Sequence, residues 1–341
     1  MDQYVGLDVS TEETSVCILD KEGTVVFEGE VASRPAAIAQ TLRRHGPAAV
    51  RIAFEAGALS SWLWHELKAL GFPVVCLDAR HAKAALSMRI NKTDRNDARG
   101  LAELVRMGWY REAKVKSMES RQMRAVLAAR AKLVDVRRDI ENQMRGLLKS
   151  MGIVLGKAGS RTLPGKILGV LRQAPHLRPL IDPMMVAHSA LASQVLKYDA
   201  QIRNLAKTDQ TLRRLMTVPG IGPVTALAYM STIDDPKRFA HACDVGAYLG
   251  LTPRRYQSGE LDRTGRISKR GDRLMRSYLF EAANVLLTVV RKASPLKTWG
   301  LKLVKRIGAK KAKVAIARKL AVILHCIWTD GTEFQWEKAN A

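Results

Sequence analysis

The chain has 341 residues, and its 56 Lys and Arg against 32 Asp and Glu give a formal charge of +24. Hydrophobic residues make up 47% and charged residues 26%, which is typical of a folded globular protein and excludes a disordered basic tail protein. The length predicts two domains. No apolar run reaches the roughly 18 residues of a membrane span, and the cysteines show no paired spacing: Cys17, Cys76, Cys243 and Cys326. We therefore expect a cytoplasmic protein with neither a disulfide framework nor a membrane partner.

The charge is distributed unevenly along the chain. Residues 1–60 carry five basic and nine acidic side chains, whereas residues 251–320 carry nineteen basic and four acidic ones. A basic excess of this size is self-repulsive unless a polyanion neutralises it, although a solvated basic face is the alternative. Nucleic acid is the expected partner, ahead of an anionic membrane.

The first eighty residues alternate strand and helix patterns. Strands are predicted at 4–9, 15–19, 24–28, 50–54 and 73–77, and helices at 35–44 and 59–70. The ribonuclease-H-type fold has this order of elements: three strands joined by tight turns, followed by helix, strand, helix and strand. The sequence therefore predicts an α/β domain with a mixed sheet.

Heptad spacing dominates the middle of the chain. Val126, Leu133, Ile140 and Leu147 are seven apart, and so are Leu191, Tyr198, Leu205 and Leu212. Two long helices separated by a segment with Gly and Pro at 151–185 predict an antiparallel helical arm or a dimerising coiled coil. A buried helical bundle is an equally open interpretation. Beyond it, Gly220 and Gly222 lie between two helical stretches and suggest a helix-hairpin-helix that holds phosphate, with a plain turn as the alternative.

Four carboxylates are the first candidate catalytic set. Asp8 and Glu55 end the first and fourth predicted strands, which are neighbours in a ribonuclease-H-type sheet. Asp94 and Asp97 are three apart at the start of a predicted helix, so both project from one face. Carboxylates that converge repel one another without a cation, and hard oxygen ligands select Mg²⁺ or Mn²⁺. The structural alternatives are that Asp8 forms a turn and that Asp94 is a helix N-cap with Asp97 as its capping partner.

Ser258 is the second candidate, because it precedes a glycine in a predicted loop rich in guanidinium groups. Arginine binds phosphate through two parallel hydrogen bonds. The basic residues near Ser258 that we expect to bind nucleic acid are Arg254, Arg255, Arg263, Arg266, Lys269 and Arg270. A serine hydroxyl is a weak nucleophile that needs a base or metal, and the sequence near Ser258 offers no convincing base. Taken alone, Ser258 is an ordinary loop serine.

A further basic stripe follows in the last hundred residues, with Lys305, Arg306, Lys310 and Lys311 expected to contact the phosphate backbone. The tryptophans at 62, 64, 299, 328 and 336 are expected to pack helices rather than to stack on bases, since aromatic residues are only 6% of the chain.

Taken together in order, these motifs resemble one known family. Asp8, Glu55 and the pair Asp94 and Asp97 look like the acidic tetrad of DEDD transposases with a RuvC-like domain. The C-terminal motifs of the same family are similar to Gly220-Ile221-Gly222, Gly250-Leu251-Thr252-Pro253, Ser258-Gly259 and Ser268-Lys269. The resemblance covers about 1–150 and 190–330 and is to the insertion-sequence-110 family of recombinases.

The resemblance implies a mechanism that spacing alone does not. It implies a transposase that cleaves and exchanges DNA strands through a covalent link to Ser258, assisted by magnesium at Asp8, Glu55, Asp94 and Asp97. It implies a structured non-coding bridge RNA that selects target and donor DNA. It also implies a composite site in a homodimer or homotetramer, joining one protomer's acidic domain to another's serine domain.

The expected domains are a RuvC-like domain at 1–116, a helical arm at 117–210, a mostly helical transposase domain at 211–330 and a tail at 331–341. Three other functions remain open. A RuvC-type junction nuclease would use the same carboxylates with water, a binding scaffold would need none of them, and an actin-like kinase shares the Gly6-Leu7-Asp8 opening.

Overall fold

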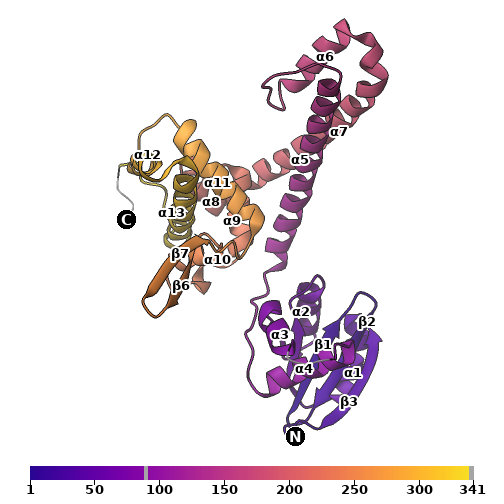
Figure 1. The fold of residues 1–341 in the computed structure, drawn as a ribbon. Helices are drawn as coiled ribbons and strands as arrows, with labels where there is room; N and C mark the ends of the chain where they lie inside the picture. The colour runs from indigo at the N-terminus through magenta and orange to yellow at the C-terminus, as the bar shows by residue number, and fades with distance from the viewer. Residues whose placement is uncertain (88–90, 338–341) are drawn as a thin grey trace. The chain divides into compact units, whose positions relative to one another are not determined.

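The computed structural model describes residues 1–87 and 91–337 (Figure 1). The chain forms two compact units, Met1–Lys116 and Ser117–Ala341. The first is mixed α/β and the second is mostly helical. Among the described residues, no helix combines the length and apolarity that crossing a membrane requires.

A five-stranded sheet organises the first unit. The strands are β1 (Gln3–Val9), β2 (Glu13–Leu19), β3 (Val25–Ala32), β4 (Ala49–Glu55) and β5 (Val74–Leu77), in the order β3-β2-β1-β4-β5. The first three pair antiparallel, and β4 and β5 continue the sheet parallel to β1. This mixed sheet agrees with the α/β prediction and is consistent with a ribonuclease-H-like domain.

Helices cover both faces of this sheet. Odd-numbered β1 side chains such as Val5 and Leu7 pack against α1 (Pro35–His45) and α2 (Ser60–Ala69). The other face, with Cys17 and Leu19, packs against α4 (Asp94–Arg106), while α3 (Ala79–Leu86) lies beside α4. Because strand side chains alternate between faces, every second residue of β1 and β4 is directed toward α4.

The second unit begins with an arm. Helix α5 (Met118–Ser150) packs along α7 (Arg178–Thr208), and α6 (Leu163–Gln173) and the 3₁₀ turn η1 (Pro175–Leu177) connect them (Figure 1). Arg130 pairs with Asp199, N–O 2.6 Å apart, and buried His188 and Glu141 lie 2.9 Å apart across the two helices. The break expected at 151–185 is shorter than the sequence indicated, because α7 continues through Pro183.

The body of the second unit surrounds one large core. Its elements are α8 (Gln210–Met216), α9 (Pro223–Ile233), η2 (Pro236–Arg238), α10 (Asp244–Tyr248), β6 (Pro253–Ser258), β7 (Leu261–Ile267), α11 (Arg273–Thr288), α12 (Pro295–Ile307) and α13 (Ala309–Asp330). Leu127 of α5 and Ile202 of α7 belong to the same core. So does Phe334, from the segment predicted as a tail, of which 338–341 lie outside the described residues.

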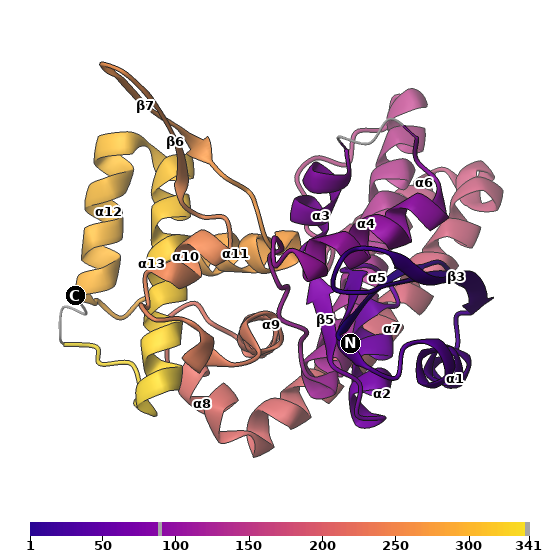
Figure 2. The same cartoon turned by 90° about the horizontal axis from the view of Figure 1, so that it is seen from below.

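The main local difference from the sequence prediction is at Ser258. The predicted loop is a β-hairpin in which Ser258 is the last residue of β6 and pairs with Leu261 of β7. Figure 2 shows this hairpin extending beyond the helices of its own unit. The alternating Arg, Tyr and Ser of β6 lack the buried apolar face that usually reveals a strand in a sequence, because every β6 side chain is exposed.

Candidate active site

The ends of β1 and β4 bring two carboxylates side by side. Leu7 and Phe54 are partners in the parallel β1–β4 ladder, and Asp8 and Glu55 follow them directly. Residues paired across adjacent strands project to the same face, so both carboxyl groups are directed toward the face that α4 covers. The neighbouring strand ends predicted from the sequence are therefore present.

Helix α4 brings the other two carboxylates to the same place. Asp94 and Asp97 lie in its first turn. The helix comes close because β1 has a glycine facing it: a Cβ on Gly6 would lie 1.9 Å from the Ala98 carbonyl oxygen and 2.5 Å from the Ala102 nitrogen. Gly6 is two residues before Asp8 and on the same face, so it positions Asp97 relative to Asp8.

The helix cap differs from the structural alternative for Asp94. The N-cap of α4 is Thr93, whose side-chain oxygen accepts a hydrogen bond from the Asn96 nitrogen at 3.1 Å. Asp94 and Asp97 are therefore not needed as the cap and its partner. Asp97 instead lies near Lys92, with 3.8 Å between the ammonium nitrogen and a carboxylate oxygen.

The electrostatics show that the negative charges of α4 act on Asp8 and Glu55 at the strand ends. Burial, reinforced by the negative charges of Asp97 and Asp94, raises the pKa of Asp8 to about 6. Burial followed by the charge of Asp97 also raises the pKa of Glu55. The Lys92 ammonium opposes both shifts. Like charges held together in this way favour binding of a cation.

The donor set fits a hard divalent cation. Carboxylate oxygens are the ligands that Mg²⁺ and Mn²⁺ prefer, and the mutual repulsion of Asp8, Asp94 and Asp97 is relieved when a cation binds between them. Within the residues that the structure describes, no three His, Cys, Asp or Glu side chains are gathered closely enough to form a finished ligand set. The strand ends and the first turn of α4 therefore carry carboxylates on the same face of the sheet without forming a complete metal site among the described residues.

A second ion pair fixes the start of α4. Arg95, which lies between the two aspartates, pairs with Glu28 of β3. Glu28 also accepts a hydrogen bond from the Cys17 thiol of β2, 3.7 Å away. The first turn of α4 is therefore anchored to the two strands beyond β1, which holds Asp94 and Asp97 over the sheet.

Ser258 belongs to the second unit and is displayed very differently. The β6–β7 register places Tyr256 opposite Arg263, and Ser258 opposite Leu261, on one face of the hairpin. Gly259 has φ of +55° in the turn that follows, a conformation that favours glycine. The hydroxyl of Ser258 forms no hydrogen bond with any other described residue. Its own hairpin therefore presents the oxygen but does not activate it.

The basic residues near Ser258 fall into two groups. Arg255 lies on the opposite face, where its guanidinium makes two hydrogen bonds to Asp262, at 2.9 and 2.6 Å. Arg263 is on the Ser258 face. The remaining candidates are exposed in or just beyond the hairpin: Arg254, Arg266, Lys269 and Arg270. The structure therefore distinguishes a neutralised arginine from arginines available to a phosphate, which the sequence did not.

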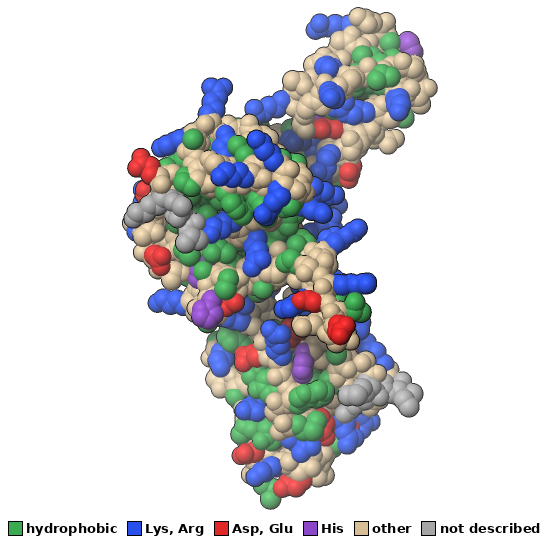
Figure 3. Space-filling view, turned by 60° about the vertical axis from the view of Figure 1, so that its left-hand side comes forward, with side chains coloured by type: hydrophobic (Ala, Val, Ile, Leu, Met, Phe, Trp, Pro, Cys, Tyr) green, Lys and Arg blue, Asp and Glu red, His purple; other side chains and the backbone are tan. Residues whose placement is uncertain are grey.

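The other predicted nucleic-acid residues lie elsewhere in the second unit. A Cβ on Gly220 would lie 2.4 Å from the Ala282 carbonyl oxygen, so this glycine permits close packing of the turn on α11, whereas Gly222 faces open space. Lys305, Arg306, Lys310 and Lys311 are exposed on α12 and α13. Figure 3 shows many Lys and Arg side chains on the visible face of this unit, with few acidic ones among them.

Sequence reasoning missed the positioning residues of the acidic set. Gly6 had a usable signal, since a glycine inside a strand suggests close approach of another backbone. Thr93 had the capping signal of a threonine directly before the helix. The Arg95–Glu28 pair had none, because the two residues are far apart in sequence and meet only after the sheet forms.

Comparison with known proteins identifies one family over most of the chain. A model of the DEDD transposase domain of the IS110 group matches residues 5–153, and a model described as "Transposase IS116/IS110/IS902 family" matches residues 212–297. The transposase for insertion sequence element IS1111A of Coxiella burnetii is 27% identical over 96% of this chain and 90% of its own. A probable family 20 transposase of Pseudomonas aeruginosa is 28% identical over 94% of this chain and 95% of its own. The pilin gene-inverting protein of Moraxella bovis is 30% identical over 48% of this chain and 56% of its own.

Proposed function

The chain belongs to the IS110 family of DNA transposases, and on this premise we propose that it cleaves and exchanges DNA strands through a covalent bond to Ser258. The carboxylates of Asp8, Glu55, Asp94 and Asp97 would hold Mg²⁺, or Mn²⁺ in its place, and the bound cation would supply neutralisation of the phosphate charge. The proposal rests on one observation. The interacting carboxylates lie in the first unit, whereas the exposed Ser258 lies in the second unit and has no activating group beside it.

The chemistry is a transfer of one phosphodiester. The Ser258 oxygen forms a bond to phosphorus, and the bond from that phosphorus to one deoxyribose oxygen breaks. The hydroxyl proton leaves to a carboxylate of the acidic set or to solvent, and the departing deoxyribose oxygen gains a proton. Attack by a deoxyribose hydroxyl of another strand reverses these changes and frees Ser258, so phosphodiester energy is conserved through the exchange. Arg263, on the same hairpin face as Ser258, binds the charged phosphate.

The two halves of this site come from different units of the fold. We propose that they also come from different protomers of a homodimer or homotetramer. Support comes from the hairpin itself: a two-stranded ribbon with every β6 side chain exposed is at best marginally stable alone and gains order by docking. A structured bridge RNA would select target and donor DNA by base pairing, which suits a chain whose basic surfaces contact phosphates rather than base edges.

The decisive experiment is adduct trapping on a DNA substrate with Mg²⁺ and the element's own non-coding RNA. Wild-type chain is expected to leave a protein–DNA adduct on a denaturing gel, and Ser258→Ala to leave none. Ser277→Ala is the matched control, because Ser277 is exposed in the same unit and bonds only to its own helix.

The same gel separates the alternatives. Cleavage that persists without an adduct in Ser258→Ala would identify a metal-dependent nuclease that uses water. Nucleic-acid binding without any cleavage, unaffected by Asp8→Asn, would identify a scaffold. Omitting the RNA tests guidance separately, because the proposal requires target cleavage to disappear with it.

A further inference from the structure

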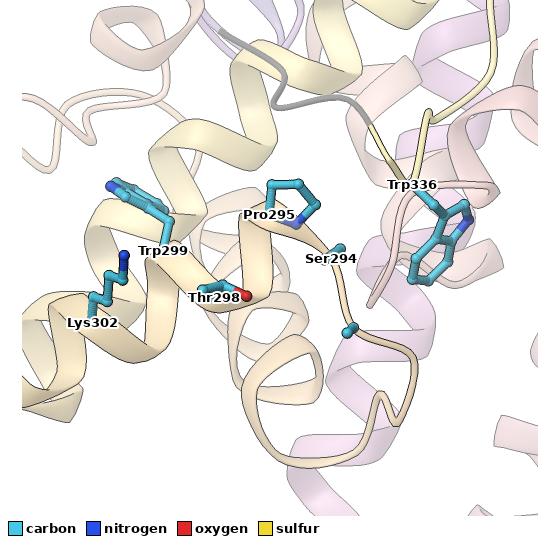
Figure 4. A pocket seen from close by; sticks show the side chains of 7 residues that line it. Ser294, Pro295, Thr298, Trp299, Lys302 and Trp336 are labelled. Carbon is cyan, nitrogen blue, oxygen red and sulfur yellow. The ribbon is translucent and has the colours of Figure 1, made fainter.

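A hollow of about 530 Å³ lies at the start of α12, lined by residues outside the β6–β7 hairpin that carries Ser258 (Figure 4). The hollow is shallow and widely open to solvent, so it offers a surface for a ligand to lie on rather than a cavity that encloses one. The residues that matter in its wall are Ser294, Pro295, Thr298, Trp299, Lys302 and Trp336. Figure 4 shows Trp299 and Lys302 on one side, and Trp336 on the other side beyond Pro295 and Ser294.

Both walls of the hollow are anchored. Ser294 is buried and caps α12, its oxygen accepting from the Lys297 nitrogen at 3.2 Å, and the Lys297 ammonium donates to the Val290 carbonyl. On the other side, the Phe334 nitrogen donates to the Thr217 hydroxyl at 2.9 Å. The Phe334 ring also meets Trp336 edge to face, with 5.5 Å between ring centroids. The two indoles are therefore carried by fixed segments.

The tryptophan at 299 does not pack as the sequence predicted. Its side chain is 40% exposed on α12, whereas Trp328 packs against the core and lies near Tyr229. Trp336 is half-buried, and the Lys292 ammonium lies 4.6 Å from its ring centroid. Trp299, partly exposed, and Lys302 line the same hollow, and an exposed indole beside an ammonium group is a surface on which a nucleobase stacks while its phosphate meets a cation.

Charge selects the class of ligand. Between Ala282 and Thr329, the stretch that includes Trp299 and Lys302, the sequence has eleven Lys and Arg residues and no Asp or Glu, whereas Asp330, Glu333 and Glu337 lie near Trp336 in the sequence. The described wall of the hollow carries Lys302 and no acidic side chain. A small apolar molecule would not need this surrounding field, whereas a polyanion is attracted to it.

We propose that this hollow binds one unpaired nucleotide of a nucleic acid, with its base on Trp299 and its phosphate toward Lys302. A paired base inside a duplex is stacked between its neighbours and does not present its face to a side chain, so the site selects single-stranded segments. This inference concerns a site separate from Ser258 and does not depend on the strand-cleavage chemistry.

The test is equilibrium binding of labelled 12-nucleotide single strands, as RNA and as DNA, and of a 12-base-pair duplex. All variants are made in a Ser258→Ala background, so that cleavage does not contribute. Trp299→Ala is expected to weaken single-strand binding about tenfold and duplex binding less than about twofold, because only the single strand loses a stacked base. Trp299→Phe should keep most of the affinity. Trp109→Ala is the matched control, since Trp109 is 52% exposed in the first unit.

Cross-linking of the unsubstituted Trp299 provides a readout that needs no variant at that position. Single strands containing 5-iodouracil, irradiated with the Ser258→Ala chain, should attach to peptides that contain Trp299 or Trp336. A loss with RNA alone or with DNA alone supports the site and identifies the strand it holds. Unchanged single-strand affinity in Trp299→Ala, equal losses for single strand and duplex, or cross-links that avoid both peptides would each overturn the proposal. If an apolar peptide bound the hollow and nucleic acid did not, the proposal would be overturned as well.

Discussion

The acidic set and the Ser258 hairpin are held by the fold in opposite ways. Asp8 and Glu55 stand on adjacent strands of a buried sheet, under a helix fixed by Gly6 and by the Arg95–Glu28 pair. Ser258 stands at the tip of a ribbon whose β6 side chains are all exposed. In the proposed mechanism, the rigid sheet would hold the carboxylates around a cation against their own repulsion, and the exposed ribbon would let Ser258 reach another surface.

The sharpest test of this comparison is to damage one region in each of two chains and mix them. Ser258→Ala and Asp8→Asn are each expected to abolish adduct formation alone. If the site is composite between protomers, a mixed oligomer contains one intact pairing: Asp8 of the first variant with Ser258 of the second. Adduct should therefore reappear on mixing and carry only the Asp8→Asn chain, which a size tag on one chain would reveal.

The mixing result needs a check that the chains exchange. Wild-type chain with a size tag should yield mixed oligomers under the same conditions. If mixed oligomers form and no adduct returns, the two regions meet within one chain, and the proposal of a composite site is wrong.

The next largest effect is expected from breaking the rigid region at its closest contact. In Gly6→Ala the new Cβ would lie 1.9 Å from the Ala98 carbonyl oxygen, so α4 must move or the unit must unfold. We expect a destabilisation of about 3 kcal/mol and a fall in cleavage of about a hundredfold. Gly57→Ala is the control, because its nearest neighbouring atom is 3.9 Å away. Thermal melting measures the stability of the two variants, and single-turnover cleavage measures their activity. A Gly6→Ala chain with normal melting and activity would contradict the role given to this contact.

A moderate effect is expected from the two faces of the hairpin. Arg263→Gln removes a guanidinium from the Ser258 face. It should slow adduct formation about tenfold, which corresponds to the free energy of one charged hydrogen bond to phosphate. Arg255→Gln removes a guanidinium already paired with Asp262 and should change the rate less than about threefold. Rates measured at saturating DNA compare the two variants, and the reverse ranking would show that the face assignment is wrong.

The smallest effect concerns the stability of the metal-free acidic set. Because the pKa of Asp8 is raised to about 6 in the fold, its ionised form is disfavoured there relative to the unfolded chain. The destabilisation is present above pH 6 and disappears as the pH falls through 6 toward the ordinary value of 3.8. Asp8→Asn should therefore stabilise the chain at pH 7.5 in EDTA by about 1 kcal/mol, after allowance for partial exposure of the carboxyl.

Denaturant unfolding measures this gain at two pH values, and the gap between variant and wild type should shrink at pH 4.5. Added Mg²⁺ should stabilise wild type more than Asp8→Asn, because it binds the folded acidic set. A variant that is less stable than wild type at pH 7.5 without metal would mean that Asp8 has a structural role.

Local patterns in the sequence were sufficient for the sheet and for the strand ends that carry Asp8 and Glu55, whereas the role of the four carboxylates stays a prediction. Short apolar runs bounded by turn residues predicted the five strands described in the first unit near their observed bounds. The ends of the first and fourth strands then followed from the expected sheet order. This worked because a strand that helices cover on both faces is a short apolar run between turn residues, which the sequence shows directly.

Tertiary structure alone decided the features that depend on contacts between distant segments. The β6–β7 hairpin has no buried face to mark it, Arg255 is neutralised by a cross-strand partner, and Trp299 is left exposed by the packing of α12. The closeness of α4 to Gly6 likewise arises only when helix and sheet pack. A sequence pattern reports what each residue prefers, whereas the partner that it finds is set by the three-dimensional packing of the whole unit.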